Sequence, residues 1–111
     1  MITTQVQDTA RGGPAVGITV ILEIRQASEW SPVGRGATDA HGRVTTLTDG
    51  RPFAPGAYRL TFDTGAYHRE QERDGPFFPE VTITFNVRDT SVDYHVPLLL
   101  SPFGYTTYRG T

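Results

Sequence analysis

The sequence predicts an all-β fold, arranged as an antiparallel sandwich or barrel. Apolar and polar residues alternate in several runs, which is the period of a strand with one buried face. Gly- and Pro-rich segments separate these runs at residues 10–14, 39–43, 54–56 and 74–79. Many short strands joined by regular turns are typical of sandwiches and barrels.

The alternation is clearest in three runs, at residues 16–25, 58–62 and 81–87. Their apolar faces consist of Val16, Ile18, Val20, Leu22 and Ile24 in the first run, Tyr58, Leu60 and Phe62 in the second, and Val81, Ile83, Phe85 and Val87 in the third. β-Branched and aromatic residues suit a pleated, half-buried surface. We therefore predict three strands that each turn one face to the core.

A single helix is expected between the second and third of these strands, at residues 64–73. This segment is short and charged, so it should lie on the surface. His68 falls within it and is expected to be exposed there.

The run from residue 94 to 101 differs because both of its faces carry apolar groups. One face holds Tyr94, Val96, Leu98 and Leu100, and the other holds His95, Pro97, Leu99 and Ser101. Proline cannot donate to a strand ladder, so we expect a free edge or a bulge at Pro97. An apolar second face predicts a contact between subunits.

Composition limits the possible functions. A length of 111 residues fits one domain over 1–111, and a net charge of −2 gives no electrostatic footprint for nucleic acid. The chain has no Cys, so disulfides and Cys-based metal sites are excluded. No apolar run approaches the ~20 residues of a membrane helix, and no signal peptide is visible. We expect a soluble, cytoplasmic protein.

Few residues or motifs in the sequence indicate a catalytic or metal-binding function on their own. The three histidines are not at metal-ligand spacing, and there is no nucleophile elbow or P-loop. His95, in the middle of a strand, is either a hydrogen-bonded interface residue or a general acid–base. His41, in a turn, is expected to be solvated. Arg43 and Arg109 are either surface cations or anchors for an anionic or carbonyl-rich ligand.

Four segments resemble one family. The block "YHVPLLLSPFGYTTYRGT" (94–111) resembles the C-terminal signature of the 5-hydroxyisourate hydrolases, the transthyretin-related proteins of purine catabolism. The segments "FDTGAYHREQERDGPFFPEVTITFNV", "TDAHGRV" and "TTQVQDTARGGPAVGITVIL" resemble the family's middle block, its Asp-Gly-Arg turn and its opening strands. The match covers nearly the whole chain in the right order.

This resemblance implies a single transthyretin-like domain, an antiparallel β-sandwich of two four-stranded sheets with one short helix. It also implies a homotetramer, a dimer of dimers, with sites at the dimer–dimer interface. The implied reaction is hydrolysis of 5-hydroxyisourate without a cofactor or metal, in which water opens the six-membered ring.

The resemblance further implies a set of site residues. His95 matches a catalytic His, Arg43 matches the Arg of the Gly-Arg turn, and Tyr108, Arg109 and Gly110 match the tail motif. Gln5 stands where members have His, and Thr111 stands where they have Ser. Thr retains a hydroxyl. Gln cannot take a proton near neutral pH, and a general base is worth ~10²–10⁴ in rate.

Three functions therefore remain open. In the first, Arg43 polarises 5-hydroxyisourate, His95 activates water, Gln5 positions that water, and the tail with Thr111 binds the substrate's edge. In the second, the chain opens another lactam or imide ring in a specialised pathway, because fold does not fix function. In the third, it is a non-catalytic ligand-binding protein.

The end of the chain, residues 102–111, is expected to form part of the site. Alternation places Tyr105, Thr107, Arg109 and Thr111 on one side of a last strand, and we expect that side to line the site.

Overall fold

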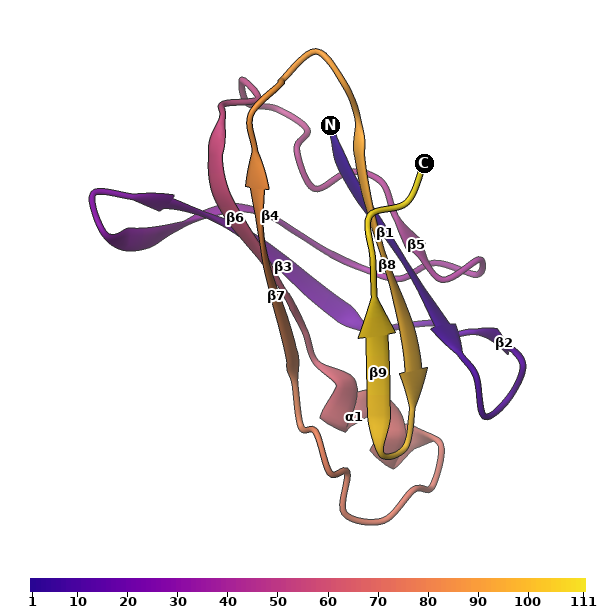
Figure 1. The fold of residues 1–111 in the computed structure, drawn as a ribbon. Coiled ribbons are helices and arrows are strands. Elements are labelled where there is room, and N and C mark those ends of the chain that lie inside the picture. Colours follow the sequence, from indigo (N-terminus) through magenta and orange to yellow (C-terminus); the bar gives the residue numbers. More distant parts are fainter.

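The computed structural model describes residues 1–111 as two β-sheets packed against each other, with a short helix at one end (Figure 1). The first sheet has the order β2 (Gly13–Pro14), β1 (Ile2–Asp8), β8 (Tyr94–Ser101) and β9 (Gly104–Thr107), with β5 (Arg43–Val44) also paired to β1. The second has the order β4 (Glu29–Ala37), β3 (Thr19–Gln26), β6 (Gly56–Phe62) and β7 (Val81–Val87). The all-β sandwich with one helix is confirmed.

The prediction of two four-stranded antiparallel sheets is wrong in two details. The first sheet has five strands, because the short strand β5 adds to β1 beside β2. Strands β1 and β8 run parallel, with Ile2 opposite Tyr94 and Asp8 opposite Leu100. A parallel pair needs a long crossover, and here the whole second sheet lies between the two strands in the sequence.

The core lies between the sheets and uses the predicted apolar faces. Each sheet contributes fully buried aliphatic side chains, which include Ile2, Val6, Leu98 and Leu100 from the first and Val20, Leu22 and Leu60 from the second. Val16 is an exception, because 46% of its surface is exposed. Gly17 turns the chain with φ of +84° immediately after Val16, and the strand begins only at Thr19.

Strand β4 was not predicted, because its sequence lacks alternation and contains a proline and two glycines. The register between β3 and β4 shifts at Leu22/Glu23, which breaks the period. A Cβ at Gly34 would overlap the backbone carbonyl of Leu47, so only glycine fits that position.

The helix α1 (Thr64–Glu70) is shorter than predicted. Asp63 caps its start by accepting a hydrogen bond from the Ala66 N–H, and Glu72 leaves the helical region with φ of +60°. The expectation that His68 is exposed is wrong, because only 1% of its surface is accessible. The helix packs this side chain against the end of the sandwich instead of turning it to solvent.

Candidate active site

The candidate residues other than Arg109 lie on the outer face of the first sheet. There Thr3 lies opposite His95 across the parallel β1–β8 pair, and Gly110 lies opposite His95 on the other side. Two residues along β1, Gln5 lies opposite both Arg43 and Pro97. Two neighbouring rows of residues therefore cross the sheet: one contains Thr3, His95 and Gly110, and the other contains Arg43, Gln5 and Pro97.

Pro97 lies where the ladder between β8 and β9 stops. Regular pairing of β9 ends at Thr107, which is opposite Leu98, and resumes only as the single bridge between His95 and Gly110. The Pro97 carbonyl accepts a hydrogen bond from Thr107 Oγ1 at 2.8 Å. The predicted interruption at Pro97 is confirmed, and it leaves the tail free to bend over the site.

Two adjoining hollows open on this face, and we call them together the His95 groove. One has a volume of about 230 Å³ and is lined by Gln5, Gln7, His95, Pro97, Leu99, Tyr108, Gly110 and Thr111. The other has a volume of about 620 Å³ and is lined by Thr3, Asp93, His95, Arg109, Gly110 and Thr111. His95, Gly110 and Thr111 belong to both, so His95 lies where the hollows meet.

The His95 imidazole is held by contacts on two sides. Its Nδ1 lies 2.8 Å from Thr3 Oγ1, and the Gly110 N–H donates to the His95 carbonyl at 2.8 Å. Burial lowers the pKa of His95 below its ordinary value of 6.5, and the positive charge of Arg43 lowers it further. The imidazole is therefore neutral at pH 7 and able to accept a proton.

Gln5 and Arg43 lie on the side of His95 toward β5. The Gln5 amide donates through Nε2 to the His41 carbonyl at 3.2 Å, so its Oε1 is left to accept a hydrogen bond. Arg43 is exposed, and its backbone N–H donates to Asp39 Oδ1 at 2.9 Å in the preceding turn. Arg43 lines neither hollow, but its charge acts on His95. His41 is exposed, as predicted.

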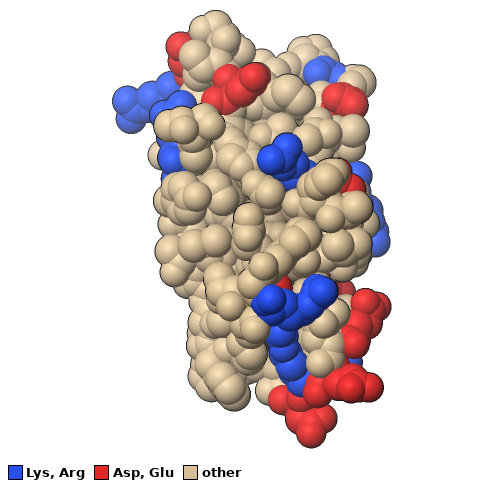
Figure 2. Space-filling model, turned by 90° about the vertical axis from the view of Figure 1, so that its right-hand side faces the viewer, with Lys and Arg blue, Asp and Glu red and all other residues tan.

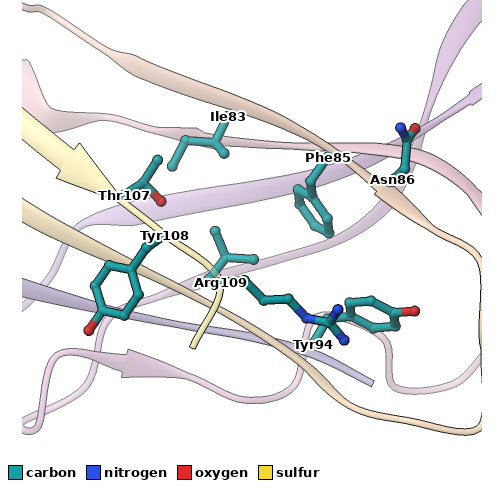
Figure 3. A pocket seen from close by; sticks show the side chains of 8 residues that line it. Ile83, Phe85, Asn86, Tyr94, Thr107, Tyr108 and Arg109 are labelled. Atoms are coloured by element: carbon teal, nitrogen blue, oxygen red, sulfur yellow. The ribbon is translucent and has the colours of Figure 1, made fainter. Parts of the chain in front are cut away.

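The tail residues divide between the two faces of the sheet. Register places Tyr108 beside Pro97 and Gly110 beside His95, on the outer face. Arg109 points to the opposite face, where its guanidinium lies 4.7 Å from the centre of the Tyr94 ring (Figure 3). Thr107 and Arg109 share one side of the tail, as predicted. That side faces Tyr94, however, and not His95, which lies on the other face of the sheet.

The Arg109 side chain borders a small apolar cavity at the open edge between the sheets. This cavity has a volume of about 150 Å³ and is lined by Ile83, Phe85, Asn86, Tyr94, Val96, Thr107, Tyr108 and Arg109. In Figure 3 the Tyr108 ring points away from the Arg109 guanidinium. Arg109 therefore stabilises the end of the tail by a cation–π contact, worth about 0.5–2 kcal/mol in proteins.

The side of the molecule that carries β1, β5 and β2 is largely uncharged. Figure 2 shows this side with isolated basic groups on a broad uncharged surface and acidic groups gathered toward the ends. A neutral polar ligand can approach such a surface without desolvating many ionised groups.

A second group of titratable residues lies at the far end of β1, and we call it the Asp8 cluster: Asp8, Arg11, Tyr67, His68 and Arg73. The Asp8 carboxylate is fully buried, accepts from Tyr67 Oη at 2.8 Å and pairs with Arg73 Nη2 at 2.9 Å. Burial alone would raise the pKa of Asp8, but hydrogen bonds from Tyr67, the Arg11 N–H and Arg73 outweigh it and lower the pKa.

His68 completes the Asp8 cluster. Its Nδ1 accepts from Arg73 Nη1 at 3.1 Å, because a guanidinium can only donate. Burial and the charge of Arg73 lower the pKa of His68.

Sequence reasoning missed two features of the site region. Thr3 was not singled out, because its contact with His95 depends on the parallel register of β1 and β8. The Asp8 cluster was missed because its members are separated by up to 65 positions in the sequence. No group of three or more His, Asp or Glu residues is assembled that could hold a metal ion, and no helix is long and apolar enough to span a membrane.

Comparison with known proteins identifies similar chains over the full length. A family model described as the HIUase/Transthyretin family matches residues 2–110. The chain is 40% identical over 111 residues to the 5-hydroxyisourate hydrolase of Salmonella typhimurium, covering all of this chain and 81% of that relative.

Solved structures agree in fold. Sea bream transthyretin in complex with thyroxine superimposes with a TM-score of 0.92 at 31% identity, covering 99% of this chain and 94% of that chain. The 5-hydroxyisourate hydrolase of Klebsiella pneumoniae gives a TM-score of 0.83 at 33% identity, covering 99% and 97%.

Proposed function

The chain belongs to the HIUase/Transthyretin family, and from this premise we propose that it hydrolyses 5-hydroxyisourate, opening the six-membered ring in urate degradation. The observation that carries the proposal is a neutral imidazole, His95, at the meeting point of two hollows in a chain 40% identical to named hydrolases of this substrate.

His95 acts first as general base. It takes a proton from water while the water oxygen attacks a ring carbonyl of the substrate. Its lowered pKa keeps the imidazole free to accept that proton at pH 7. The imidazolium then returns the proton to the ring nitrogen as the carbon–nitrogen bond breaks. The ring opens to a carboxylic acid, which loses its proton to solvent to give the carboxylate, and His95 is neutral again.

Gln5 and Arg43 support this step. Gln5 Oε1 accepts a hydrogen bond from the attacking water, because the bond from Nε2 to the His41 carbonyl orients the amide and Oε1 has no protein partner. Arg43 supplies positive charge for the oxyanion that develops on the attacked carbonyl, a contribution typically worth ~10²–10³ in rate. Tyr108, Gly110 and Thr111 close the groove around the substrate, and Arg109 holds the tail in place through Tyr94.

A homotetramer, a dimer of dimers, completes the site. The His95 groove is open in one chain, and the outer face of β8 presents the half-buried Leu99 beside it. A second copy packed on this face would exclude water from the groove and strengthen the electrostatic interactions in it. Light scattering on the purified protein tests this assembly; a monomer that retains full activity would contradict it.

The decisive experiment is the decay of freshly prepared 5-hydroxyisourate, followed by absorbance with the natural protein and with Gln5→His. We expect the natural protein to accelerate decay well beyond buffer. A folded oligomer that leaves the decay at the buffer rate would refute the proposal. If only Gln5→His is active, the natural chain has moved away from the ancestral reaction, and opening of another lactam or imide ring becomes the leading alternative.

A second candidate, a non-catalytic ligand carrier, is favoured by one observation. The TM-score of 0.92 to thyroxine-bound sea bream transthyretin exceeds the 0.83 to the Klebsiella hydrolase. Sequence identity points the other way, with 40% to the Salmonella hydrolase against 31% to that transthyretin. Thyroxine binding measured by calorimetry, together with 5-hydroxyisourate decay unchanged by His95→Ala, would establish the carrier.

A further inference from the structure

The contact between Thr3 and His95 is fixed by the backbone. The two residues are direct partners in the parallel β1–β8 register, and their backbones are held by pairs on both sides, Ile2 with Tyr94 and Thr4 with Val96. Thr3 Oγ1 lies 2.8 Å from His95 Nδ1 and is half-buried. Two residues 92 positions apart thus meet in a geometry that neither strand can change alone.

Gly110 restricts the imidazole on the opposite side. A Cβ at this position would lie 2.7 Å from His95 Cδ2, closer than real Cβ contacts. The ring is therefore confined between the Thr3 hydroxyl and the Gly110 backbone. Nδ1 is engaged by Thr3, so Nε2 is the ring nitrogen left without a protein partner and available to the His95 groove.

A neutral imidazole carries its single proton on one nitrogen, and the partner of the other nitrogen decides which one. Because the Thr3 hydroxyl can accept as well as donate, it suits both the neutral ring and the imidazolium. We propose that Thr3 is a positioning residue that accepts a hydrogen bond from His95 Nδ1–H and so keeps the lone pair on Nε2. The inference deepens the proposed function, in which Nε2 is the base that takes the proton of water.

The charges that face His95 bear on this proposal. Arg43 acts on the ring from the β5 side, and Asp93 and Arg109 border the same hollow. None of them forms a hydrogen bond with either ring nitrogen. The neutral hydroxyl of Thr3 is the one side chain that bonds to the ring and can select its tautomer.

His68 provides an internal reference for measuring the tautomer of His95. His68 accepts from Arg73 at Nδ1, so His68 must carry its proton on Nε2. Imidazole ¹⁵N chemical shifts at pH 7.5 therefore give two opposite patterns in one sample, Nε2–H for His68 and Nδ1–H for His95. An Nε2–H pattern for His95 in the natural protein would overturn the proposal.

Variants test whether Thr3 causes the tautomer. Thr3→Val keeps the β-branched shape and removes the hydroxyl, so we expect His95 to shift toward Nε2–H and kcat to fall about 10-fold, the effect of one lost hydrogen bond. Thr3→Ser restores the hydroxyl and should recover both readouts. Thr84→Val, on an exposed position of β7, is the matched control and should change neither.

The outcomes separate this inference from the proposed function. An unchanged His95 tautomer and an unchanged kcat in Thr3→Val would refute the role of Thr3. If the natural protein does not act on 5-hydroxyisourate, the proposed function fails, but the ¹⁵N shifts of natural protein, Thr3→Val and Thr3→Ser still decide the role of Thr3. If Thr3→Val fails to fold, the natural protein and Thr3→Ser decide it: the Nδ1–H pattern in both is expected, and the Nε2–H pattern in either contradicts it.

Discussion

The His95 groove and the Asp8 cluster each place a histidine with a lowered pKa next to strand β1, but they leave it in opposite states. In the Asp8 cluster, hydrogen bonds join Asp8 to Tyr67 and Arg73, and Arg73 to His68. No buried side-chain polar atom in the protein lacks a partner. In the groove, His95 uses Nδ1 and leaves Nε2 open to a hollow.

This difference shows that a perturbed pKa alone does not identify a site of chemistry. Burial and an arginine lower the pKa of both histidines, and the direction of the shift is the same. What separates them is access: only 1% of the His68 surface is accessible, whereas His95 is half-buried and its free nitrogen borders a hollow, where it can exchange a proton with a ligand.

The largest expected effect comes from His95→Ala. Loss of the general base should lower kcat/KM for 5-hydroxyisourate by ~10²–10⁴, while the thermal midpoint changes little because the side chain is only half-buried. The matched control is His41→Ala, which removes an exposed histidine in the turn beside Gln5. Equal activity of both variants and the natural protein would remove His95 from the mechanism.

Asp8→Ala should lower the stability of the fold, whereas His95→Ala lowers activity. It leaves the buried Tyr67 hydroxyl and the partly buried Arg73 guanidinium without their shared carboxylate, so we expect a loss of about 3 kcal/mol in the free energy of unfolding. Asp49→Ala, at an exposed carboxylate, should cost less than ~1 kcal/mol. Urea unfolding measures both. A stability loss in Asp8→Ala no greater than that in Asp49→Ala would mean that the cluster does not stabilise the fold.

Acid should affect both regions, but through different observables. Since the folded pKa of each histidine lies below 6.5, the proton binds the unfolded chain more readily, and stability is lost as the pH falls from about 6.5 toward the folded pKa. Each histidine lowers the free energy of unfolding by at most about 1.4 kcal/mol for each unit that the pH falls in this range. The rate falls in the same direction, because protonated His95 cannot act as a base.

His68→Gln separates the two acid effects. It should flatten the dependence of unfolding free energy on pH below 6.5 and leave the acid limb of kcat/KM in place. Urea titrations and initial rates at pH 5–8 provide the measurement. If the acid limb of kcat/KM disappears in His68→Gln, the titration that controls the rate belongs to His68 and not to His95.

The smallest effect is expected at Gly110. An added Cβ in Gly110→Ala would lie 2.7 Å from His95 Cδ2, so the imidazole must shift, and we expect kcat to fall by about 10-fold or less, with little change in stability. Gly13→Ala is the control, because nothing lies within 4 Å of a Cβ there. Similar rates for both variants would show that the ring tolerates displacement.

The sequence predicted the parts of the fold that follow from a strict period. Strand β7 and the buried face of β8 were anticipated because alternation is uninterrupted there. Strand β4 escaped because a bulge shifts its register and glycine is required beside Leu47. The helix was located, but its buried face was not, because packing against the sandwich overrides local polarity at His68.

The candidate site was predicted as a set of residues and not as an arrangement. His95, Gln5 and the tail were named from a resemblance, but their faces depend on strand pairing. The parallel register of β1 and β8 brings Thr3 to His95, and alternation within one strand cannot reveal that register. The same limit explains Arg109: alternation grouped it correctly with Thr107, but that side of the tail was expected to line the site and Arg109 instead contacts Tyr94.

The pairing of β1 with β8 also determines when the site can form during synthesis and folding. Thr3 and His95 are 92 residues apart. At 5–20 residues per second, β1 waits roughly 5–20 s on the ribosome for its partner to be made. Closing so long a loop adds entropy cost and slows folding. The imidazole reaches its working position only after β8 has docked, so an incomplete chain has the residues of the first strand but no base beside them.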